Sequence, residues 1–373
     1  MRFAVEHDVL SSAVTFAARV VPSRTVRPVL SSLLLAADEN RLSMTASDLE
    51  TSAVCSIPAQ VDEPGRVALP IKYISELLRR VPGGRLGWSA SGNGTTTEIS
   101  WEKSRFTVHG FDPAEFPPVT SFGTDADVML PSATLRNAIQ GSIFAAAEGE
   151  TARPLLSGVE LRFAAGNVFA LSTDGFQAAS FASSAGAPRP DGDGVVVPAT
   201  ALAAVNRLLD DPQQMCEVAV RNNQILFRVG DRYLVTRLLE GRFFSVLDLV
   251  PKSFSTVLDA EREALLGACA RVALITDNEP PHTIVLEMRE GALRLTAASP
   301  EVGQAEEEVP AEVTGPAVRV GFNARQLQDG LRHLDGVYVR IELSGAKTLA
   351  RFTDPRNACL QFLQMPLDMR DAD

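Results

Sequence analysis

The sequence has 373 residues, of which 45% are hydrophobic and 22% are charged, as is usual for a soluble globular protein and not for a disordered one. No apolar run approaches the roughly 18 residues that span a bilayer, so we expect no membrane-spanning helix and no membrane partner. The net charge of −11 argues against a protein that holds nucleic acid by bulk attraction, because such domains are usually basic.

The beginning of the chain indicates no export. Residues Met1–Leu10 contain Glu6 and Asp8 and lack the apolar core of a signal peptide, so we expect a cytoplasmic protein. The four cysteines are far apart and form no C-x-x-C pair, which predicts reduced core residues and neither a zinc site nor a disulfide framework. These cysteines are Cys55, Cys216, Cys269 and Cys359. We expect no metal and no cofactor.

Three sequence landmarks recur in the same order along the chain. An apolar, strand-like stretch appears at Val29–Leu35, Leu155–Leu161 and His282–Met288. A strand that breaks into a polar turn appears at Leu42–Asp48, Ala170–Phe176 and Leu293–Ser299. A short strand running into an amphipathic helix appears at Ala68–Leu78, Val196–Val205 and Val320–Leu331. The second landmark starts at residues 42, 170 and 293, and the third starts at residues 68, 196 and 320. This spacing predicts a repeat of the size of a whole domain.

Each third of the sequence predicts two helices and about eight short strands. The predicted helices are residues 9–24, 71–81, 132–140, 199–209, 260–272 and 324–334, and alternating stretches such as Arg105–Val108 and Tyr233–Leu238 predict strands with one wet face. The expected fold is α+β, with three similar domains of helices packed on antiparallel sheets. Linkers at Thr120–Ala126 and Pro251–Thr256 separate domains of residues 1–122, 127–250 and 256–373. The stretch Ala185–Gly194 predicts a surface loop, and Gly92-Asn93-Gly94 a hairpin turn.

The charges are distributed unevenly between the predicted helices and the remaining chain. The six helices contain eleven basic and four acidic residues, a net charge of +7, so the remaining residues carry −18. If all six helices line one surface, that surface is basic although the protein is acidic. Such a surface would bind DNA weakly and with strong salt dependence. A simple alternative is that each amphipathic helix exposes arginines to solvent.

Enzyme signatures are weak in this sequence. It has neither a G-x-x-x-x-G-K-[ST] phosphate loop nor an H-E-x-x-H motif. The stretch Ser100–Lys103 fits S-x-x-K, but the acyl-transfer chemistry of that motif needs the serine at a helix start, together with S-D-N and K-T-G motifs that are missing. We therefore predict a protein without catalytic residues.

An ordered set of motifs along essentially the whole chain resembles the bacterial sliding clamps, the beta subunits of the replicative DNA polymerase. The motifs are Arg27–Leu35, Met44–Glu50, Ser104–Phe106, Phe111–Pro117, Ser172–Gly175, Gly241–Phe243 and Met365–Pro366. The resemblance implies a DNA-clamp fold and a head-to-tail homodimeric ring with helices inside and sheets outside. Such a ring encircles duplex DNA independently of sequence and acts as a processivity factor for DNA replication.

The resemblance also implies a pocket for short linear peptides of the polymerase, the clamp loader and repair proteins. Its first half would consist of Leu156, Thr173, Gly175, Phe176, Gln177, Ala178, Phe244, Leu249, Leu363 and Met365. Its second half would consist of Asn323, Gln326, Ala346, Thr348, Pro366 and Leu367. This sequence departs from the family at Phe176-Gln177, often a His-Arg pair, at Phe244, a Pro in the family, and in its extended acidic end, Leu367–Asp373. These departures predict a pocket that is more apolar at one end.

Two further surfaces follow from the resemblance. At the joint between subunits, a basic edge strand of the first repeat would meet an acidic run in the third repeat of the other subunit. The residues from the first repeat are Lys103, Arg105, Phe106 and Val108, and those from the third repeat are Leu274, Ile275, Glu301, Glu306, Glu307 and Glu308. DNA would face Arg24, Lys72 and Arg79. Two other functions stay open: an adaptor that binds peptides without encircling DNA, and an S-x-x-K acyl-transfer enzyme.

Overall fold

The computed structural model describes residues 1–22, 24–91, 95–120, 122–123, 125–149, 153–184, 194–278 and 280–368. Contacts divide the chain into two compact units, Met1–Leu135 with Thr200–Leu238, and Arg136–Ala199 with Leu239–Asp373. Each unit contains its own sheets and its own buried hydrophobic residues. The predicted turn at 92–94, nearly all of the predicted loop at 185–194, and residues 369–373 of the acidic end lie outside the described residues.

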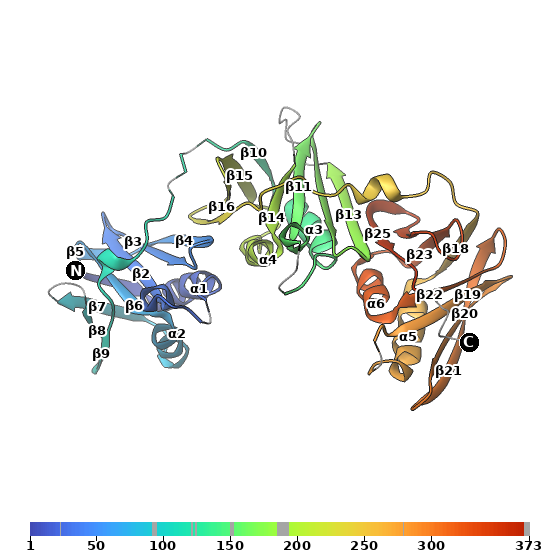
Figure 1. Ribbon diagram of the computed structural model, residues 1–373. Coiled ribbons are helices and arrows are strands. Elements are labelled where there is room, and N and C mark those ends of the chain that lie inside the picture. The colour runs from blue at the N-terminus through green and yellow to red at the C-terminus, as the bar shows by residue number, and fades with distance from the viewer. Residues whose placement is uncertain are drawn as a thin grey trace. The chain divides into compact units, whose positions relative to one another are not determined.

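The predicted threefold repeat is confirmed by the order of elements (Figure 1). The first copy is β1 (Arg2–Glu6), α1 (His7–Ala17), β2 (Ser32–Asp38), β3 (Arg41–Ser47), β4 (Thr51–Pro58), β5 (Gln60–Glu63), β6 (Gly65–Pro70), α2 (Ile71–Arg80), β7 (Arg85–Ser91), β8 (Thr96–Trp101) and β9 (Ser104–His109). The second is β10 (Val128–Pro131), α3 (Ser132–Ile143), β11 (Gly158–Ala164), β12 (Asn167–Thr173), β13 (Gln177–Ser184), β14 (Val195–Pro198), α4 (Ala199–Leu208), β15 (Met215–Arg221), β16 (Gln224–Val229) and β17 (Arg232–Arg237). The third is β18 (Thr256–Glu261), α5 (Arg262–Val272), β19 (Thr283–Arg289), β20 (Ala292–Ser299), β21 (Gly303–Thr314), β22 (Val318–Asn323), α6 (Ala324–His333), β23 (Tyr338–Leu343), β24 (Ala350–Asp354) and β25 (Asn357–Gln364).

Short 3-10 helices connect some of these elements. They are η1 (Pro28–Ser31), η2 (Pro113–Glu115), η3 (Pro154–Ser157), η4 (Val246–Leu249) and η5 (Ala273–Ile275). The first landmark of the repeat therefore begins with a helical turn in two copies, since η1 and η3 precede β2 and β11. A proline at the first position of each turn favours this conformation, because its φ angle is already suited to a helix and its missing N–H has no partner to lose.

The first unit contains two antiparallel sheets. One has the strand order β5-β1-β7-β8-β9, and the other has the order β10-β15-β16-β17-β4-β3-β2-β6. The larger sheet joins the first and second repeats, because β17 pairs with β4 and places Tyr233 opposite Val54. Helices α1 and α2 lie side by side (Figure 1), and α1 packs on β3 and β4. Its buried residues Leu10, Ala13 and Ala17 follow the helical spacing of one apolar face.

The prediction that the first helix extends to residue 24 is wrong. Helix α1 ends at Ala17, and the amides of Arg19, Val20 and Val21 bond three residues back, as in a tightening turn. Pro22 disfavours a helical residue before it, and Val20 and Val21 are β-branched, so the sequence stops the helix here. The observed helices contain nine basic and four acidic residues, a net charge of +5 instead of +7.

The prediction that Tyr233–Leu238 has one wet face is also wrong. In β17 the consecutive residues Leu234, Val235 and Thr236 are all buried. Val235 belongs to a small cluster with Ala219 and Leu226, against which Phe122 packs. Phe122 lies in the predicted linker, so this connection covers the outer face of the strand.

The second unit contains a twelve-stranded sheet with the order β14-β11-β12-β13-β25-β24-β23-β18-β21-β20-β19-β22. Strand β13 pairs with β25, placing Ala178 opposite Leu363, and this pairing joins the second and third repeats. Helices α5 and α6 lie side by side on the third repeat (Figure 1). The fully buried rings of Phe322, Phe352 and Phe362 form a continuous aromatic core beneath them, with centroids 5.3–5.8 Å apart.

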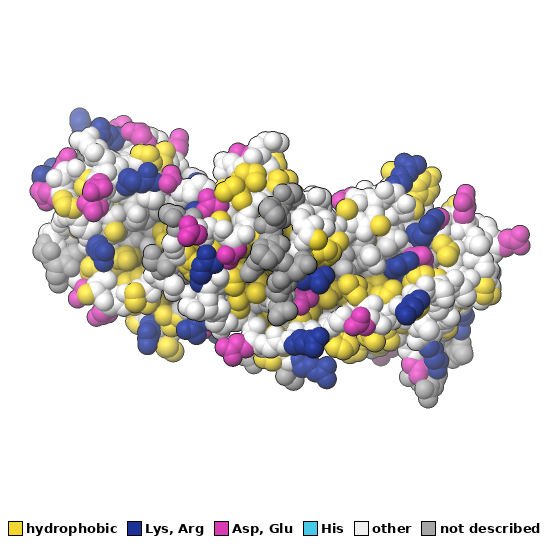
Figure 2. Space-filling model, turned by 90° about the horizontal axis from the view of Figure 1, so that it is seen from above, with side chains coloured by type: hydrophobic (Ala, Val, Ile, Leu, Met, Phe, Trp, Pro, Cys, Tyr) yellow, Lys and Arg dark blue, Asp and Glu magenta, His cyan; other side chains and the backbone are white. Residues whose placement is uncertain are grey.

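The surface mixes apolar and charged side chains. Figure 2 shows hydrophobic side chains among both basic and acidic ones on one face of the molecule. Within the described ranges, no helix is long and apolar enough to cross a membrane. Cys55, Cys216 and Cys269 are buried, as predicted for core residues, whereas Cys359 is only partly buried.

Candidate functional site

The second unit contains a cavity of about 680 Å³ formed by separate parts of the chain. Its walls come from η3, the β12–β13 turn, the connection after β17, and the residues beside β24 and β25. The lining residues are Arg153, Pro154, Leu155, Leu156, Thr173, Gly175, Phe176, Gln177, Ala178, Glu240, Arg242, Phe243, Phe244, Val246, Leu249, Leu349 and Met365. Cavities of this size bury most of a small ligand or a few peptide side chains.

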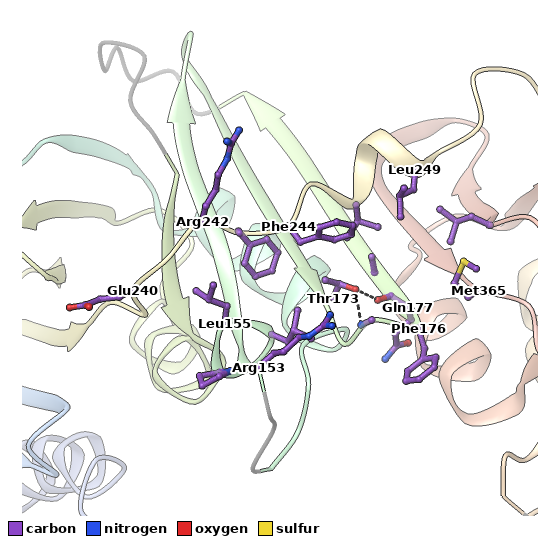
Figure 3. Close-up of a pocket in the computed structure, with 17 residues that line it drawn as sticks. Arg153, Leu155, Thr173, Phe176, Gln177, Glu240, Arg242, Phe244, Leu249 and Met365 are labelled. Atoms are coloured by element: carbon purple, nitrogen blue, oxygen red, sulfur yellow. Dashed lines mark hydrogen bonds between the residues drawn. The ribbon is translucent and has the colours of Figure 1, made fainter.

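The floor of the cavity is apolar and closely packed. Ala178, Val246 and Leu349 form a buried cluster with Leu363, which lies under the cavity on β25. At the rim, four large apolar side chains are open to solvent: Phe176 is 66% exposed, Phe244 57%, Leu249 56% and Met365 40%. Figure 3 shows that Glu240 and Arg242 point away from this apolar group. The arrangement suits a partner that inserts apolar side chains.

The β12–β13 turn presents Phe176 at the rim. Asp174 Oδ1 accepts hydrogen bonds from the backbone N–H groups of Phe176 (2.7 Å) and Gln177 (2.8 Å). The hydroxyl of Thr173 donates to the carbonyl of Gln177 (2.6 Å) and accepts from the N–H of Gly175 (Figure 3). Gly175 has a φ of +98°, which glycine adopts without the steric penalty of a side chain. The turn is therefore held by its own polar groups.

The opposite wall depends on Gly241 and Phe243. Gly241 has a φ of +128°, and a Cβ atom there would lie 2.7 Å from Leu155 Cδ1. The missing side chain lets the connection after β17 pass close to η3. Phe243 is then buried with Leu171 and Val196, while Phe244 faces the rim. This packing gives the Gly241–Phe243 motif a structural reason.

Many of the sixteen residues predicted for the peptide pocket are brought together. Those that line the cavity are Leu156, Thr173, Gly175, Phe176, Gln177, Ala178, Phe244, Leu249 and Met365. Leu363 lies beneath it. Six others do not line it: Asn323, Gln326, Ala346, Thr348, Pro366 and Leu367. Of these, Gln326 and Asn323 contribute to a hydrogen-bond network behind the turn, because Gln326 Nε2 donates to Asp174 Oδ2 (2.9 Å) and Asn323 Oδ1 accepts from the Gln326 N–H.

Sequence reasoning missed eight lining residues. They are Arg153, Pro154, Leu155, Glu240, Arg242, Phe243, Val246 and Leu349. Most of them lie in connections between elements, where the sequence has no helical or strand periodicity that would indicate which side chains face the cavity. A usable signal was the apolar density of residues 243–250 inside an irregular connection, since exposed connections are usually polar.

The predicted subunit joint includes an open strand edge on the first repeat. Strand β9 is the last strand of its sheet and, within the described ranges, pairs only with β8. Phe106 on this strand is about half exposed and stacks on Trp101 with ring centroids 5.0 Å apart. Lys103 and Arg105 are exposed and Val108 is partly buried. An edge of this kind is available to another strand.

The third repeat contains a second strand edge that is open as far as the described residues extend. Residues Gly303–Pro310 of β21 pair with β20, while β18 pairs only with residues 311–314. Glu301, shortly before β21, is exposed, and the turn η5, which contacts β21, contains the exposed Leu274 and the partly buried Ile275. Glu306 is paired with Arg294, and Glu307 accepts two 2.6 Å hydrogen bonds from Arg271. The hydrogen bond from Arg294 lowers the pKa of the Glu306 carboxyl, and those from Arg271 lower the pKa of the Glu307 carboxyl. Two charges of the acidic run are therefore already paired within the chain, and Glu308 is exposed.

The predicted DNA-facing residues are all exposed. Lys72 and Arg79 lie on α2, and Arg79 forms an ion pair with Glu76 at 3.1 Å. Arg24 follows the end of α1 instead of lying on the helix. These residues can contact phosphates, but nothing in their arrangement reads a base sequence.

The S-x-x-K alternative does not fit the structure. Ser100 lies within strand β8 and its hydroxyl contacts the carbonyl of Gly87 at 3.4 Å. Lys103 is exposed after that strand, whereas the chemistry requires the serine at a helix start and a buried lysine.

Known proteins are similar to this chain over nearly its full length. Profiles of the DNA polymerase III beta subunit match residues 1–120 for its N-terminal domain, 129–244 for its central domain and 247–368 for its C-terminal domain. The beta sliding clamp of Synechocystis sp. (strain ATCC 27184 / PCC 6803 / Kazusa) is 28% identical, with 98% of this chain and 99% of that protein aligned. The crystal structure of the Bacillus subtilis sliding clamp has a TM-score of 0.94 at 24% identity and 99% coverage of both chains. That of the Pseudomonas aeruginosa DNA polymerase III subunit beta has a TM-score of 0.93 at 27% identity, covering 98% of this chain and all of the other. The chain therefore belongs to the DNA polymerase III beta subunit family, the beta sliding clamps.

Proposed function

We propose that this chain is a DNA polymerase processivity factor. Two copies form a ring around duplex DNA, and the cavity of the second unit tethers the replicative polymerase and other partners. The observation that carries the proposal is the family match along almost the whole chain, combined with a preformed apolar cavity in this particular structure. The chain acts without catalysis of its own, and it works in the cytoplasm, where bacterial DNA is replicated.

The two open strand edges support the ring. Strand β9 of one subunit would pair with Gly303–Pro310 of β21 in the other, so that each joint extends a sheet across two chains. The exposed ring of Phe106 and the side chain of Ile275 would supply an apolar centre. Because each subunit has one edge of each kind, two subunits can close a head-to-tail ring. Each subunit would consist of domains of residues 1–122, 127–250 and 256–373.

The cavity supports binding of short peptides. A peptide that buries two apolar side chains gains about 1.5–3 kcal/mol from each. The loss of its free motion offsets much of this gain. We therefore expect micromolar affinity, which is tight enough to recruit a partner and weak enough to let partners exchange on one ring.

A measurement of mass in solution tests the ring directly. The 40.0 kDa chain should behave as a dimer of about 80 kDa by light scattering at micromolar concentration. An adaptor that binds peptides without encircling DNA needs no dimer. A monomer at all accessible concentrations would contradict the proposed ring while leaving the peptide cavity to be tested by itself.

A further inference from the structure

Phe176 combines an exposed side chain with a fixed backbone. Its ring is the most exposed of the large apolar side chains around the cavity. Its N–H donates to Asp174 Oδ1, and its carbonyl accepts a 2.8 Å hydrogen bond from the N–H of Met365. An aromatic wall that is already in place loses little conformational freedom when a partner packs against it.

Asp174 connects this turn to helix α6. One carboxylate oxygen accepts the two turn amides, and the other accepts a 2.9 Å hydrogen bond from Gln326 Nε2. Both oxygens of Asp174 therefore have partners, one in the second repeat and one in the third. Gln326 is partly exposed and is not one of the residues that line the cavity.

Gln326 is itself held in place. Its N–H donates to the side chain of Asn323, the N-cap of α6, and Asn323 Nδ2 donates to the carbonyl of Pro281 (2.8 Å). Gln364 Nε2 contacts both the Asn323 carbonyl (3.0 Å) and Gln326 Oε1 (3.5 Å). The side chain that reaches Asp174 thus projects from a helix end that three polar groups fix.

We propose that Gln326 is a positioning residue for the peptide cavity: through Asp174 it fixes the turn that carries Phe176, without contacting the peptide. This inference rests on the proposed peptide-binding function of the cavity. It replaces the expectation that Gln326 contacts the peptide directly. Supporting side chains of this kind determine how accurately a binding surface is held.

A pair of substitutions isolates the contact. In Gln326→Glu two carboxylates face each other, so the turn loses a donor and gains repulsion, and the peptide dissociation constant should rise roughly tenfold. Adding Asp174→Asn should restore affinity, because the new amide donates to the new carboxylate. Asp174→Asn alone should bind nearly like the parent, since the Gln326 amide can turn its oxygen toward the asparagine. The matched control is Gln328→Glu, the same change on the same helix away from the turn.

The experiment is a titration of a fluorescent polymerase-derived peptide against the parent and these four variants. Unchanged affinity of Gln326→Glu would overturn the proposal, and so would a loss that Asp174→Asn does not restore, because Gln326 would then act on the peptide itself. Hydrogen exchange of the amides at residues 175–177, measured without peptide, gives a second readout. It should accelerate in Gln326→Glu and return in the double variant. If the parent binds no peptide, the proposed function fails, and the exchange rates still decide whether Gln326 holds the turn.

Discussion

His7 ties the two helices of the first repeat together. Its Nε2 lies 2.8 Å from the carbonyl of Leu78 at the end of α2, and its Nδ1 lies 2.8 Å from Asp8 Oδ1. The protonated ring can donate from both nitrogens at once, so the hydrogen bond to Leu78, and then that to Asp8, raise the pKa of His7 above 6.5.

This raised pKa predicts a pH dependence of stability. Protonation of His7 favours the folded state, so its contribution is complete below the ordinary pKa of 6.5 and disappears as the pH rises through the higher folded-state pKa. Urea midpoints of the parent and of His7→Gln should therefore differ more at about pH 5.5 than at about pH 8.5. A difference that is the same at both pH values would contradict this role.

Phe176 provides the sharpest test of the cavity at the residue scale. Phe176→Ala removes the exposed aromatic wall, and the peptide dissociation constant should rise about tenfold or more, while dimer mass and DNA retention stay unchanged. Met365→Ala should act in the same direction. Tyr73→Ala is the matched control, because Tyr73 is a similarly exposed aromatic residue on α2, outside the cavity. If Phe176→Ala and Met365→Ala both bind like the parent, the cavity is not the peptide site.

Residues of the cavity differed in how far the sequence could identify them. The Ser172–Gly175 and Met365–Pro366 motifs placed two walls, because their resemblance to the family is local and ordered. Gln326 could be named but its contact could not, since a hydrogen bond between residues 152 positions apart depends on the pairing of β13 with β25. Leu349 had no signal, because its burial follows only from the cluster it joins.

Helix α6 packs on strand β25 at Gly330, where a Cβ atom would lie 2.2 Å from the ring of Phe362. In an exposed helix, replacing Gly by Ala stabilises by about 1 kcal/mol. Here Gly330→Ala should instead destabilise by about 1–3 kcal/mol, since the buried ring cannot move without disturbing its neighbours. Denaturant unfolding measures the sign, and a stabilised variant would show that the helix can move away from the sheet at little cost.

The strand edges predict how the ring can be opened. Ile275→Asp places a charge in the proposed apolar centre of the joint, at a cost of several kcal/mol by analogy with broken buried pairs. The dimer should dissociate at low micromolar concentration, as measured by light scattering. Val337→Asp is the control, because Val337 is exposed before β23 and outside the edges of β9 and β21. A dimer that survives Ile275→Asp would place the joint elsewhere.

The positions of helices and strands were predictable where one face of the element is buried and the other is exposed to solvent. The end of α1 was misjudged because apolar residues continue to Val21 although the helix does not. Strand β17 was misjudged because Phe122, from a connection, covers its second face. The two errors have different causes: at α1 the local backbone restrictions of Val20, Val21 and Pro22 end the helix although the apolar residues continue, and at β17 a segment from elsewhere in the chain decides burial, which no local periodicity reports.

The net charge of the whole molecule limits how strongly the protein can bind DNA directly. The chain is acidic overall, with a net charge of −11, and its helices carry +5. Most of the helical arginines are paired with carboxylates of the same chain: Arg79 and Arg80 with Glu76, Arg262 with Glu263, Arg271 with Glu307, Arg325 with Asp277, and Arg332 with Asp329. Direct affinity for linear duplex should therefore be weak and salt-dependent. Lasting attachment to DNA then requires a closed ring.

Retention on circular and linear DNA at high salt tests this topological attachment most directly. A ring closed around a nicked circular plasmid by a clamp loader should stay bound when salt is raised, because salt weakens phosphate contacts and leaves the ring closed. Cutting the same plasmid once should release the protein from the free ends. The measurement is the fraction of labelled protein that co-elutes with DNA in gel filtration before and after cutting. Retention on the circle with loss from the linear form is the predicted result, and equal loss from both forms would contradict a protein that encircles DNA.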